Sequence, residues 1–458
     1  MPFSSIVTLS TSLIAAPAAP PDTVRITAIV APEVPAGVTA LATSYSSLSE
    51  MEDDDWTTGD VAYDAMSAIM TQTPVETQVS GVIVIKRGTA VANVWTHDQL
   101  STTDGEHTLS IDGVLAATFT ASTSTAADIS AGLIAAFNAG DFAATHTAAV
   151  VDTDTLSITG AVAGVPFILT AAAPGGDAPT VTQTVESVGV YEDLDAAFAL
   201  LPFWRVYVPG MVDAEIREAL RWVQADTVSR RNFLVYDEAG VGVYDATDTD
   251  SLAYEFKVAG HTRVNGLCHP NATEYAQGMA IGRVGGGFPG RRAQHYIALS
   301  GSVETTVSAN RTSGQVSTME DRAVSWTERL FGPTSDLLLL APAPNIPSGH
   351  YIYQRHAEDY WWYTMRAAID GYLKRDEGVD LDAAGLQDLA DFVAQQMLPL
   401  VTNNVIADDF TVTFTPLADI PAGELAIGDY KTSGKILASA TITPKLRKLT
   451  VSAEFSLV

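Results

Sequence analysis

Cys268 and His269, in the segment GLCHP, are the pair of residues that most resembles a catalytic nucleophile and its base. A cysteine becomes an effective nucleophile when a neighbouring imidazole accepts its thiol proton. The surrounding segment HTRVNGLCHP predicts a β-strand, and adjacent residues of a strand point to opposite faces of the sheet. The two side chains are therefore not expected to meet, and Cys268 is interpreted as a buried structural thiol.

Three other segments contain residue types that bind phosphate or metal ions. GRVGGGFPGRR is rich in glycine and arginine but lacks the Gly-Lys-Ser/Thr ending of a phosphate-binding loop. YDATDTDS contains Asp245, Asp248 and Asp250 but lacks the glycine and the closing glutamate of a calcium loop. His350 and His356 have no evident third metal ligand. We interpret the first two segments as a flexible loop and an acidic surface loop, and we expect no metal ion or cofactor.

The aromatic segment EDYWWYTMR contains Trp361 and Trp362, which could form a stacking platform for a sugar. Adjacent tryptophans in a predicted helix more often belong to the core or to a subunit contact. No acid, base and nucleophile come together anywhere in the sequence, so the sequence predicts a structural or interaction protein and not an enzyme.

The charge of the chain narrows the class of partner. It has 25 basic and 54 acidic residues, for a formal net charge of −29. This disfavours nucleic acid and anionic lipid as partners, because both attract Lys and Arg. A single cysteine excludes an internal disulfide, and no apolar run is long enough to predict stable membrane insertion. The opening MPFSSIVTLSTSL lacks the basic region of a signal peptide and is interpreted as mature chain made in the cytoplasm.

Predicted helices and strands divide the chain into domains. Residues 1–24 predict an extended N-terminal arm, and residues 25–91 with 189–330 predict a layered α/β middle domain in which helix and strand alternate. Residues 92–188 predict a small, acidic, β-rich insert. Residues 331–458 predict a C-terminal α+β core domain that ends in a strand. The expected fold class is therefore a multidomain protein of α/β and α+β architecture.

The insert differs from its flanks in charge. Between Arg87 and Arg205 the sequence has no Lys or Arg and thirteen acidic residues, which favours a separate module facing solvent. HTLSIDGVLAATFTA predicts a hairpin that turns at Asp112-Gly113. TAADISAGLIAAFNAG predicts a helix with Gly140 at its C-cap, and DTLSITG and VPFILTAAAPGG predict two further strands.

Both ends of the chain predict extended, apolar-faced segments. The last strand alternates apolar and polar residues, and its apolar positions are Leu449, Val451, Ala453, Phe455 and Leu457. The N-terminal segment SSIVTLSTSL, with Ile6, Val7 and Leu9, has a similar pattern. An unpaired apolar strand favours aggregation, so each end either pairs within its own subunit or joins the sheet of a neighbour by β-augmentation. A basic stretch with Lys445, Arg447 and Lys448 precedes the last strand and contrasts with the acidic character of the rest of the chain.

The order of these segments resembles the sheath protein of contractile phage tails and related injection machines. The similar segments are the N-terminal arm, GDVAYDAMSAIMTQTP followed by VSGVIVIKR, the small β-rich insert, AQGMAIGRVGGGFPGRRAQHY, and the C-terminal region that ends in KLRKLTVSAEFSLV. The resemblance covers nearly the whole chain. Residues 205–260 depart most from the pattern of the family.

The resemblance implies a structural subunit of a virion, assembled in the host cytoplasm. Such subunits stack as hexameric rings around an inner tail tube, with a baseplate at one end and a tail terminator protein at the other. Terminal strands exchanged between subunits join the rings, and contraction from a metastable extended state drives the tube through the host envelope. The strands at Ile6, Val7 and Leu9 and at Leu449–Leu457 would be the exchanged arms. Lys445, Arg447 and Lys448 would face the tube or an acidic neighbour. The helix Ala383 to Leu398, with Asp388 and Asp391, or the loop after it would contact the tube.

A different function class remains open from composition alone. A Thr- and Ala-rich acidic chain with β-modules also suits a secreted cell-surface adhesin or lattice protein. That alternative requires export, which the N-terminal sequence does not favour.

Overall fold

The computed structural model describes residues 6–11, 25–72, 81–99, 102–176, 179–225, 231–269, 272–284, 297–299, 311–328, 337–340, 342, 344–373, 383–403, 410–414, 437–442 and 451–457. The chain divides into two compact units. Unit 1 consists of Met1–Lys86, Ala197–Met211 and Leu220–Val458, and unit 2 consists of Arg87–Ala196 and Val212–Ala219.

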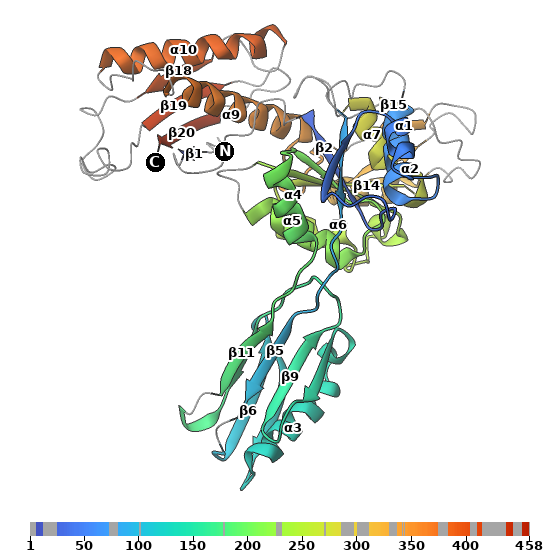
Figure 1. The fold of residues 1–458 in the computed structure, drawn as a ribbon, viewed down its shortest axis with the longest axis vertical. Helices are drawn as coiled ribbons and strands as arrows, with labels where there is room; N and C mark the ends of the chain where they lie inside the picture. Colours follow the sequence, from blue (N-terminus) through green and yellow to red (C-terminus); the bar gives the residue numbers. More distant parts are fainter. Residues whose placement is uncertain are drawn as a thin grey trace. The chain divides into compact units, whose positions relative to one another are not determined.

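A nine-stranded sheet is the centre of the described part of unit 1 (Figure 1). Its order is β15-β17-β16-β14-β13-β12-β2-β4-β3. The strands are β2 (Thr27–Ala31), β3 (Ala42–Tyr45), β4 (Val82–Lys86), β12 (Arg205–Tyr207), β13 (Phe233–Glu238), β14 (Val264–Cys268), β15 (Ile297–Leu299), β16 (Ser325–Glu328) and β17 (Leu337–Leu340). The six strands from β16 to β4 are parallel to one another, whereas β3, β15 and β17 run antiparallel to their neighbours.

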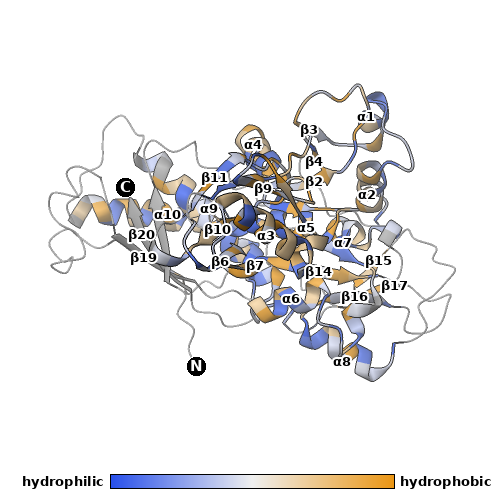
Figure 2. Cartoon of the chain, turned by 90° about the horizontal axis from the view of Figure 1, so that it is seen from below, coloured by the Kyte–Doolittle hydropathy of each residue, from blue (hydrophilic) through white to orange (hydrophobic). Residues whose placement is uncertain are grey.

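The sequences of the parallel strands explain their position. β2 reads TAIVA and is buried at every residue, and β4 reads VIVIK and is buried up to its lysine. Figure 2 shows the hydrophobic character of these two strands. Strands that are apolar on both sides require covering layers on both faces, as in doubly wound α/β sheets.

Helices are interspersed with these strands along the chain. Those that lie wholly in unit 1 are α1 (Leu48–Asp53), α2 (Val61–Met70), α6 (Leu252–Ala259), α7 (Ala276–Val284), α8 (Ser313–Asp321), α9 (Ile352–Leu373) and α10 (Ala383–Thr402). α4 (Val190–Leu200) and α5 (Asp213–Ala225) have residues in both units. Short 3-10 turns are η4 (Val241–Tyr244) and η5 (Ala272–Glu274).

Two glycines of α7 allow this helix to lie directly against α2. A Cβ at Gly282 would be 2.1 Å from the carbonyl oxygen of Ile69, and one at Gly278 would be 2.9 Å from that of Ala65. Real Cβ atoms do not approach oxygen so closely, so any other residue would force the helices apart. The small-residue pattern AQGMAIG therefore has a packing function.

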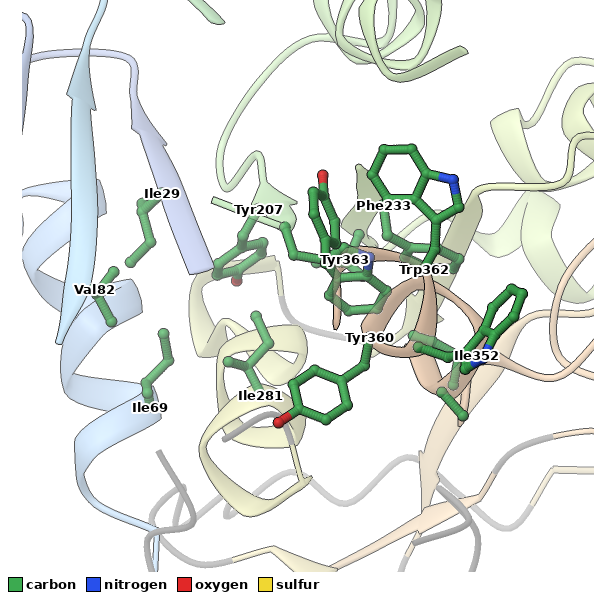
Figure 3. Close-up of a cluster of buried hydrophobic side chains, with 14 of the residues drawn as sticks. Ile29, Ile69, Val82, Tyr207, Phe233, Ile281, Ile352, Tyr360, Trp362 and Tyr363 are labelled. Carbon is green, nitrogen blue, oxygen red and sulfur yellow. The ribbon is translucent and has the colours of Figure 1, made fainter. Parts of the chain in front are cut away.

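Helix α9 is buried along nearly its whole length. Trp361, Trp362 and Tyr363 are at most 1% exposed and belong to the same core as the strands of the large sheet. Figure 3 shows Tyr360, Trp362 and Tyr363 from α9 beside Phe233 and Tyr207 from the sheet. The prediction that the two tryptophans are core residues is confirmed.

A separate four-stranded sheet contains both ends of the described chain. Its order is β1-β20-β19-β18, with β1 (Ile6–Thr11), β18 (Thr411–Phe414), β19 (Leu437–Ile442) and β20 (Val451–Leu457). α10 lies against β18 and also packs on α9. Figure 1 shows α10 beside this sheet.

Unit 2 contains two small sheets and the whole of helix α3 around a core of its own (Figure 1). One sheet has the order β10-β6-β7 and the other β11-β5-β9-β8. The elements are β5 (Val94–Asp98), β6 (Gly105–Ile111), β7 (Val114–Ala121), α3 (Ala126–Asn138), η2 (Asp141–Ala144), β8 (His146–Val150), β9 (Thr155–Gly160), β10 (Leu169–Ala172), η3 (Pro174–Gly176) and β11 (Thr180–Val185).

The predicted hairpin of this unit is confirmed: β6 pairs with β7, and Asp112 and Gly113 both have positive φ, as a two-residue type I′ turn requires. The helix α3 is also confirmed, but its predicted C-cap is wrong by one residue. Ala139 caps the helix with right-handed backbone, and Gly140 is extended and begins the next 3-10 turn. The chain therefore leaves α3 without the left-handed glycine that the prediction assumed.

One ion cluster holds separate segments of unit 2 together. Arg87 donates to Asp193 at 3.1 Å and to Glu215 at 2.8 Å, and the backbone N–H of Gly88 donates to Asp193 at 3.0 Å. The side chains of Arg87 and Asp193 are each under 10% exposed. Partly buried, multiply bonded pairs of this kind stabilise more than exposed ones.

The pattern of pairing differs from the sequence expectation in one place. β17, in the segment DLLLLAPAP that opens the predicted C-terminal domain, pairs with β15 and β16 and so extends the nine-stranded sheet beyond residue 331. The strands β3, β5, β8, β11, β15 and β16 were not predicted, because they are short or lack strict alternation.

Candidate functional site

The thiol of Cys268 lies at the end of β14 and is 1% exposed. Burial raises its pKa to about 11, against which the guanidinium of Arg311, 3.9 Å from Sγ, acts only weakly. The thiolate needed for nucleophilic attack is therefore scarce at neutral pH. This confirms the interpretation of Cys268 as a structural thiol.

The acidic loop that contains Asp245, Asp248 and Asp250 is held in place by hydrogen bonds from Arg322. Arg322 donates from Nη2 to the backbone carbonyl oxygens of Asp245 at 2.8 Å and Asp248 at 2.5 Å. The Asp245 carboxylate accepts from the N–H of Thr247, and that of Asp248 from the N–H of Ser251, which lowers the pKa of both acids. Within the described ranges no group of three or more His, Cys, Asp or Glu residues could hold a metal ion.

The other candidate ligands are also accounted for by local contacts. Nδ1 of His350 lies 2.9 Å from the hydroxyl of Ser348, and the ring of His356 stacks on Trp204 with centroids 4.2 Å apart. Of GRVGGGFPGRR, residues 282–284 belong to α7, and the rest lies outside the described residues.

The carboxyl ends of the parallel strands are the usual ligand site of a doubly wound sheet. Here Tyr207 of β12 donates its hydroxyl to the carboxylate of Asp237 of β13, which also accepts from the N–H of Gln277 at 2.7 Å. Burial raises the pKa of Asp237 to about 6, despite these two donors. The Tyr207 hydroxyl and the Gln277 backbone N–H thus both bond to the Asp237 carboxylate.

The terminal sheet is the remaining candidate site. β1 runs parallel to β20 in a register that pairs Val7 with Ala453 and Leu9 with Phe455. The two segments are separated by almost the whole length of the chain, and each provides the other with backbone partners. β20 lies between β1 and β19, so the strand at the C-terminal end of the described chain is an inner strand of the sheet.

The register brings apolar positions of all four strands together. Phe455 is paired with Ala438 of β19, and Ala438 with Phe414 of β18; Ala453 is paired with Ala440, and Ala440 with Val412. These pairings are register positions of the backbone, and the apolar residues of the four strands coincide in them. Val412 of β18 packs against the core that includes α10.

One predicted arm residue is out of register with these apolar positions. Ile6 is paired with Ser452 and so alternates with Val7 and Leu9. Val451, Ala453, Phe455 and Leu457 lie in β20. Leu449 and the basic residues Lys445, Arg447 and Lys448 lie outside the described residues.

The predicted tube-contact residues lie on the outer side of α10. Asp388 and Asp391 are exposed, and Gln387 donates to Asp391 at 2.9 Å. The opposite side of the helix is buried through Leu389, Val393 and Met397. The helix therefore presents its carboxylates away from the core. None of the helices in the described part of the chain combines the length and hydrophobicity of a membrane span.

No protein-family model and no curated protein match the sequence. The crystal structure of a sheath tail protein from Listeria innocua is similar over 94% of this chain and 94% of that chain, with a TM-score of 0.51 and 9% sequence identity. The chain has the fold of a tail sheath protein. The resemblance drawn from the order of the sequence segments is thereby confirmed at the level of the fold.

Two cryo-EM structures of the anti-feeding prophage are similar to part of the chain. The baseplate structure matches 56% of this chain and 68% of that chain at 11% identity, with a TM-score of 0.39. The helical sheath in the contracted state matches 59% and 75% at 13% identity, also with a TM-score of 0.39. At these TM-scores the two likenesses add nothing to the assignment of the sheath fold.

Proposed function

We propose that this chain is the structural subunit of a contractile tail sheath and not an enzyme. It polymerises as helically stacked hexameric rings around an inner tail tube, and it contracts from a metastable extended state to drive the tube through the host envelope. The observation that carries this proposal is the sheath fold over 94% of the chain, combined with a sheet in which the two terminal strands pair. Its place is the virion tail, assembled in the host cytoplasm.

Strand exchange is the proposed link between subunits. Thirteen residues, 12–24, separate β1 from the first residue described in the body of unit 1, and eight residues, 443–450, separate β19 from β20. Extended, these segments could span roughly 45 Å and 28 Å. Either strand can thus reach a neighbouring subunit and form there the same register that it forms within one chain, as in domain swapping.

The free energy of pairing in the exchanged sheet is large enough to hold subunits together. β20 is paired with β1 over six positions and with β19 over six. Backbone hydrogen bonds contribute about 1 kcal/mol net each, and apolar burial adds about 25 cal/mol per Å². A link of this strength persists while weaker contacts exchange, which a contracting assembly needs.

Other surfaces have assigned partners in the proposal. The carboxylates of Asp388 and Asp391 on α10 contact the tail tube protein, and Lys445, Arg447 and Lys448 face the tube or an acidic neighbour. The acidic insert, 92–188, faces solvent, where its charge keeps tails apart. Baseplate and tail terminator proteins bind the two ends, and no nucleotide or cofactor is consumed.

Paired cysteines at positions 9 and 455 test strand exchange directly, because these positions are in register. The double variant Leu9→Cys with Phe455→Cys is assembled and oxidised, and the chain is examined on a denaturing gel without reductant. Exchange between subunits gives a ladder of covalent multimers. Monomers alone, from particles that negative-stain microscopy shows to be intact tubes, would refute exchange.

A charge placed in β20 provides a matched comparison. Phe455→Asp puts a carboxylate at an apolar position of the alternating last strand, whereas Ser456→Asp puts one at the neighbouring polar position. We expect negative-stain microscopy to show tubes for the second variant and none for the first. Tubes from both variants, or from a chain without residues 449–458, would contradict the proposal, and flat sheets would favour a lattice protein.

Reversal of the two carboxylates on α10 tests the proposed tube contact. Asp388→Lys with Asp391→Lys should weaken co-sedimentation with the tube protein and leave polymerisation of the sheath protein alone unchanged. Gln395→Lys, which also adds charge on the exposed side of the helix, is the control. Unchanged co-sedimentation would remove α10 as the contact.

A further inference from the structure

Two adjacent acidic residues of α9, Glu358 and Asp359, are buried, with 5% and 0% exposure. Asp359 receives a bidentate pair from Arg263, with both Nη–Oδ distances at 2.8 Å, and the indole N–H of Trp204 at 2.7 Å. Glu358 receives Arg231 at 3.3 Å and Arg355 at 2.6 Å. We call these residues the α9 ion network.

Apart from Arg355, which belongs to α9 itself, the partners of the two acids come from the beginnings of three neighbouring strands. Trp204 directly precedes β12, Arg263 directly precedes β14, and Arg231 lies two residues before β13. β12, β13 and β14 are adjacent and parallel in the large sheet. One turn of α9 is thus bonded to the N-terminal ends of three adjacent parallel strands.

Further bonds link this turn to the same edge. Arg263 also donates to the carbonyl oxygen of Asn232 at 3.0 Å, and the backbone N–H of Arg231 donates to the hydroxyl of Tyr363, one turn along α9, at 3.0 Å. Burial opposes ionisation of Asp359, but Arg263, Arg231 and the indole N–H of Trp204 together outweigh it and hold the pKa of this acid below its usual value. The Asp359 carboxylate is therefore ionised at neutral pH.

A buried ion network is a costly way to attach a helix, because apolar packing of the same volume stabilises as well or better. The ion network differs from apolar packing in its geometry. Bidentate hydrogen bonds from a planar guanidinium form in only one orientation and at only one axial position of the carboxylate. α9 therefore has a defined axial position on the sheet, which the surrounding aromatic side chains alone do not impose.

The same helix leads to the terminal sheet. α9 packs on α10, and α10 lies against β18, the outer strand next to β19. We propose that the α9 ion network is the joint through which a pull on the terminal sheet is passed to the nine-stranded sheet. The source of the pull rests on the proposed sheath function, but the joint itself is a property of the single chain.

Hydrogen exchange on the unassembled full-length chain tests the joint. Asp359→Asn keeps the shape of the side chain and removes its charge. We expect protection of the α9 amides to fall about tenfold or more while β2 and β4, in the same unit, keep theirs. The exposed Asp321→Asn at the end of α8, also in unit 1, is the matched control and should change neither.

Two results would overturn the proposal: unchanged protection of α9, or an equal loss across α9, β2 and β4, since the network would then be ordinary core. If Asp359→Asn fails to fold, Glu358→Gln is measured instead, with the same selective loss expected on a smaller scale. Since no polymer is needed, the result is independent of the cysteine cross-linking that tests the sheath function.

Discussion

Unit 1 and the insert of unit 2, residues 92–188, bury polar groups in opposite ways. Unit 1 encloses full charges, in Arg231, Arg263 and their acidic partners on α9. The insert of unit 2, with no Lys or Arg from 88 to 204, encloses side-chain amides instead: Asn93 and Gln99 are at most 1% exposed. Ring nitrogen Nδ1 of His107 lies 3.3 Å from the Gln99 amide, and Nε2 lies 3.0 Å from the Thr103 carbonyl oxygen.

This difference follows from what each sequence offers. A buried carboxylate needs a cation, and the insert has none to spare, so all of its acidic residues must reach solvent or a helix N-terminus. Unit 1 has the arginines to compensate buried acids, and it uses them where one helix must be fixed to three strands. The units are therefore expected to respond differently to mutation and to pH.

Tryptophan fluorescence can follow the two units separately. Trp95 is the tryptophan of unit 2, and its indole N–H donates to the carbonyl oxygen of Phe167 at 2.8 Å. Trp56, Trp204, Trp222, Trp326, Trp361 and Trp362 all belong to unit 1. A variant in which only Trp95 remains reports unit 2 alone.

The largest effect is expected for Arg263→Met. It removes the bidentate partner of Asp359 and leaves that carboxylate buried, which costs about 3–5 kcal/mol. Urea unfolding followed by the tryptophans of unit 1 should show this loss, and Trp95 should show little of it. If the free energy of unfolding falls by less than about 1 kcal/mol, the buried charges of unit 1 do not distinguish it from the insert of unit 2.

Acidification should destabilise unit 2 through His97. Burial lowers the pKa of this 1%-exposed histidine from 6.5 to about 4. Above pH 6.5 both folded and unfolded forms are neutral; between pH 6.5 and 4 the unfolded form binds a proton that the folded form does not. Stability should fall by about 2 kcal/mol from pH 7 to pH 5. Urea unfolding followed by Trp95 fluorescence measures this loss of stability. In His97→Leu the stability of unit 2 should depend less on pH. An equally steep pH dependence in this variant would contradict the role of His97.

Asp237 should give unit 1 the opposite response over the same range. Its pKa is raised by burial from 3.8 to about 6, so the folded form keeps a proton that the unfolded form has lost. Stability from this group is complete below pH 3.8 and declines as pH rises through 6, by about 1 kcal/mol between pH 5 and pH 7. Asp237→Asn should remove that decline in urea unfolding of unit 1. A variant that is less stable than the parent at pH 8 but not at pH 5 would reverse the assignment.

The smallest effects are expected at two matched helix N-termini. Thr125 in unit 2 and Thr312 in unit 1 each form a capping box, with Asp128 and Gln315 respectively. Thr125→Ala and Thr312→Ala should each cost about 0.5–1 kcal/mol. Thermal unfolding should show the first in the Trp95 signal and the second in unit 1; loss in the wrong signal would show that the units do not unfold separately.

Much of the local structure was predictable from the sequence. The hairpin at Asp112-Gly113, the helices α3, α9 and α10 and the alternating last strand all follow from the sequence, because each depends on a few neighbouring residues. The structural interpretation of Cys268 also followed from its strand. The short strands β15 and β16 were missed, because three or four residues carry too little periodicity.

The sequence by itself therefore determined where this chain forms strands and helices, and that its insert must expose its acids. Only the tertiary structure decided what each element pairs with: that β1 lies beside β20, in the register Leu9 to Phe455, and that Asp359 meets Arg263, 96 residues away. Periodicity and turn chemistry are local properties of the chain. Partnership across long separations depends on how all the surfaces fit at once, and no single segment contains that information.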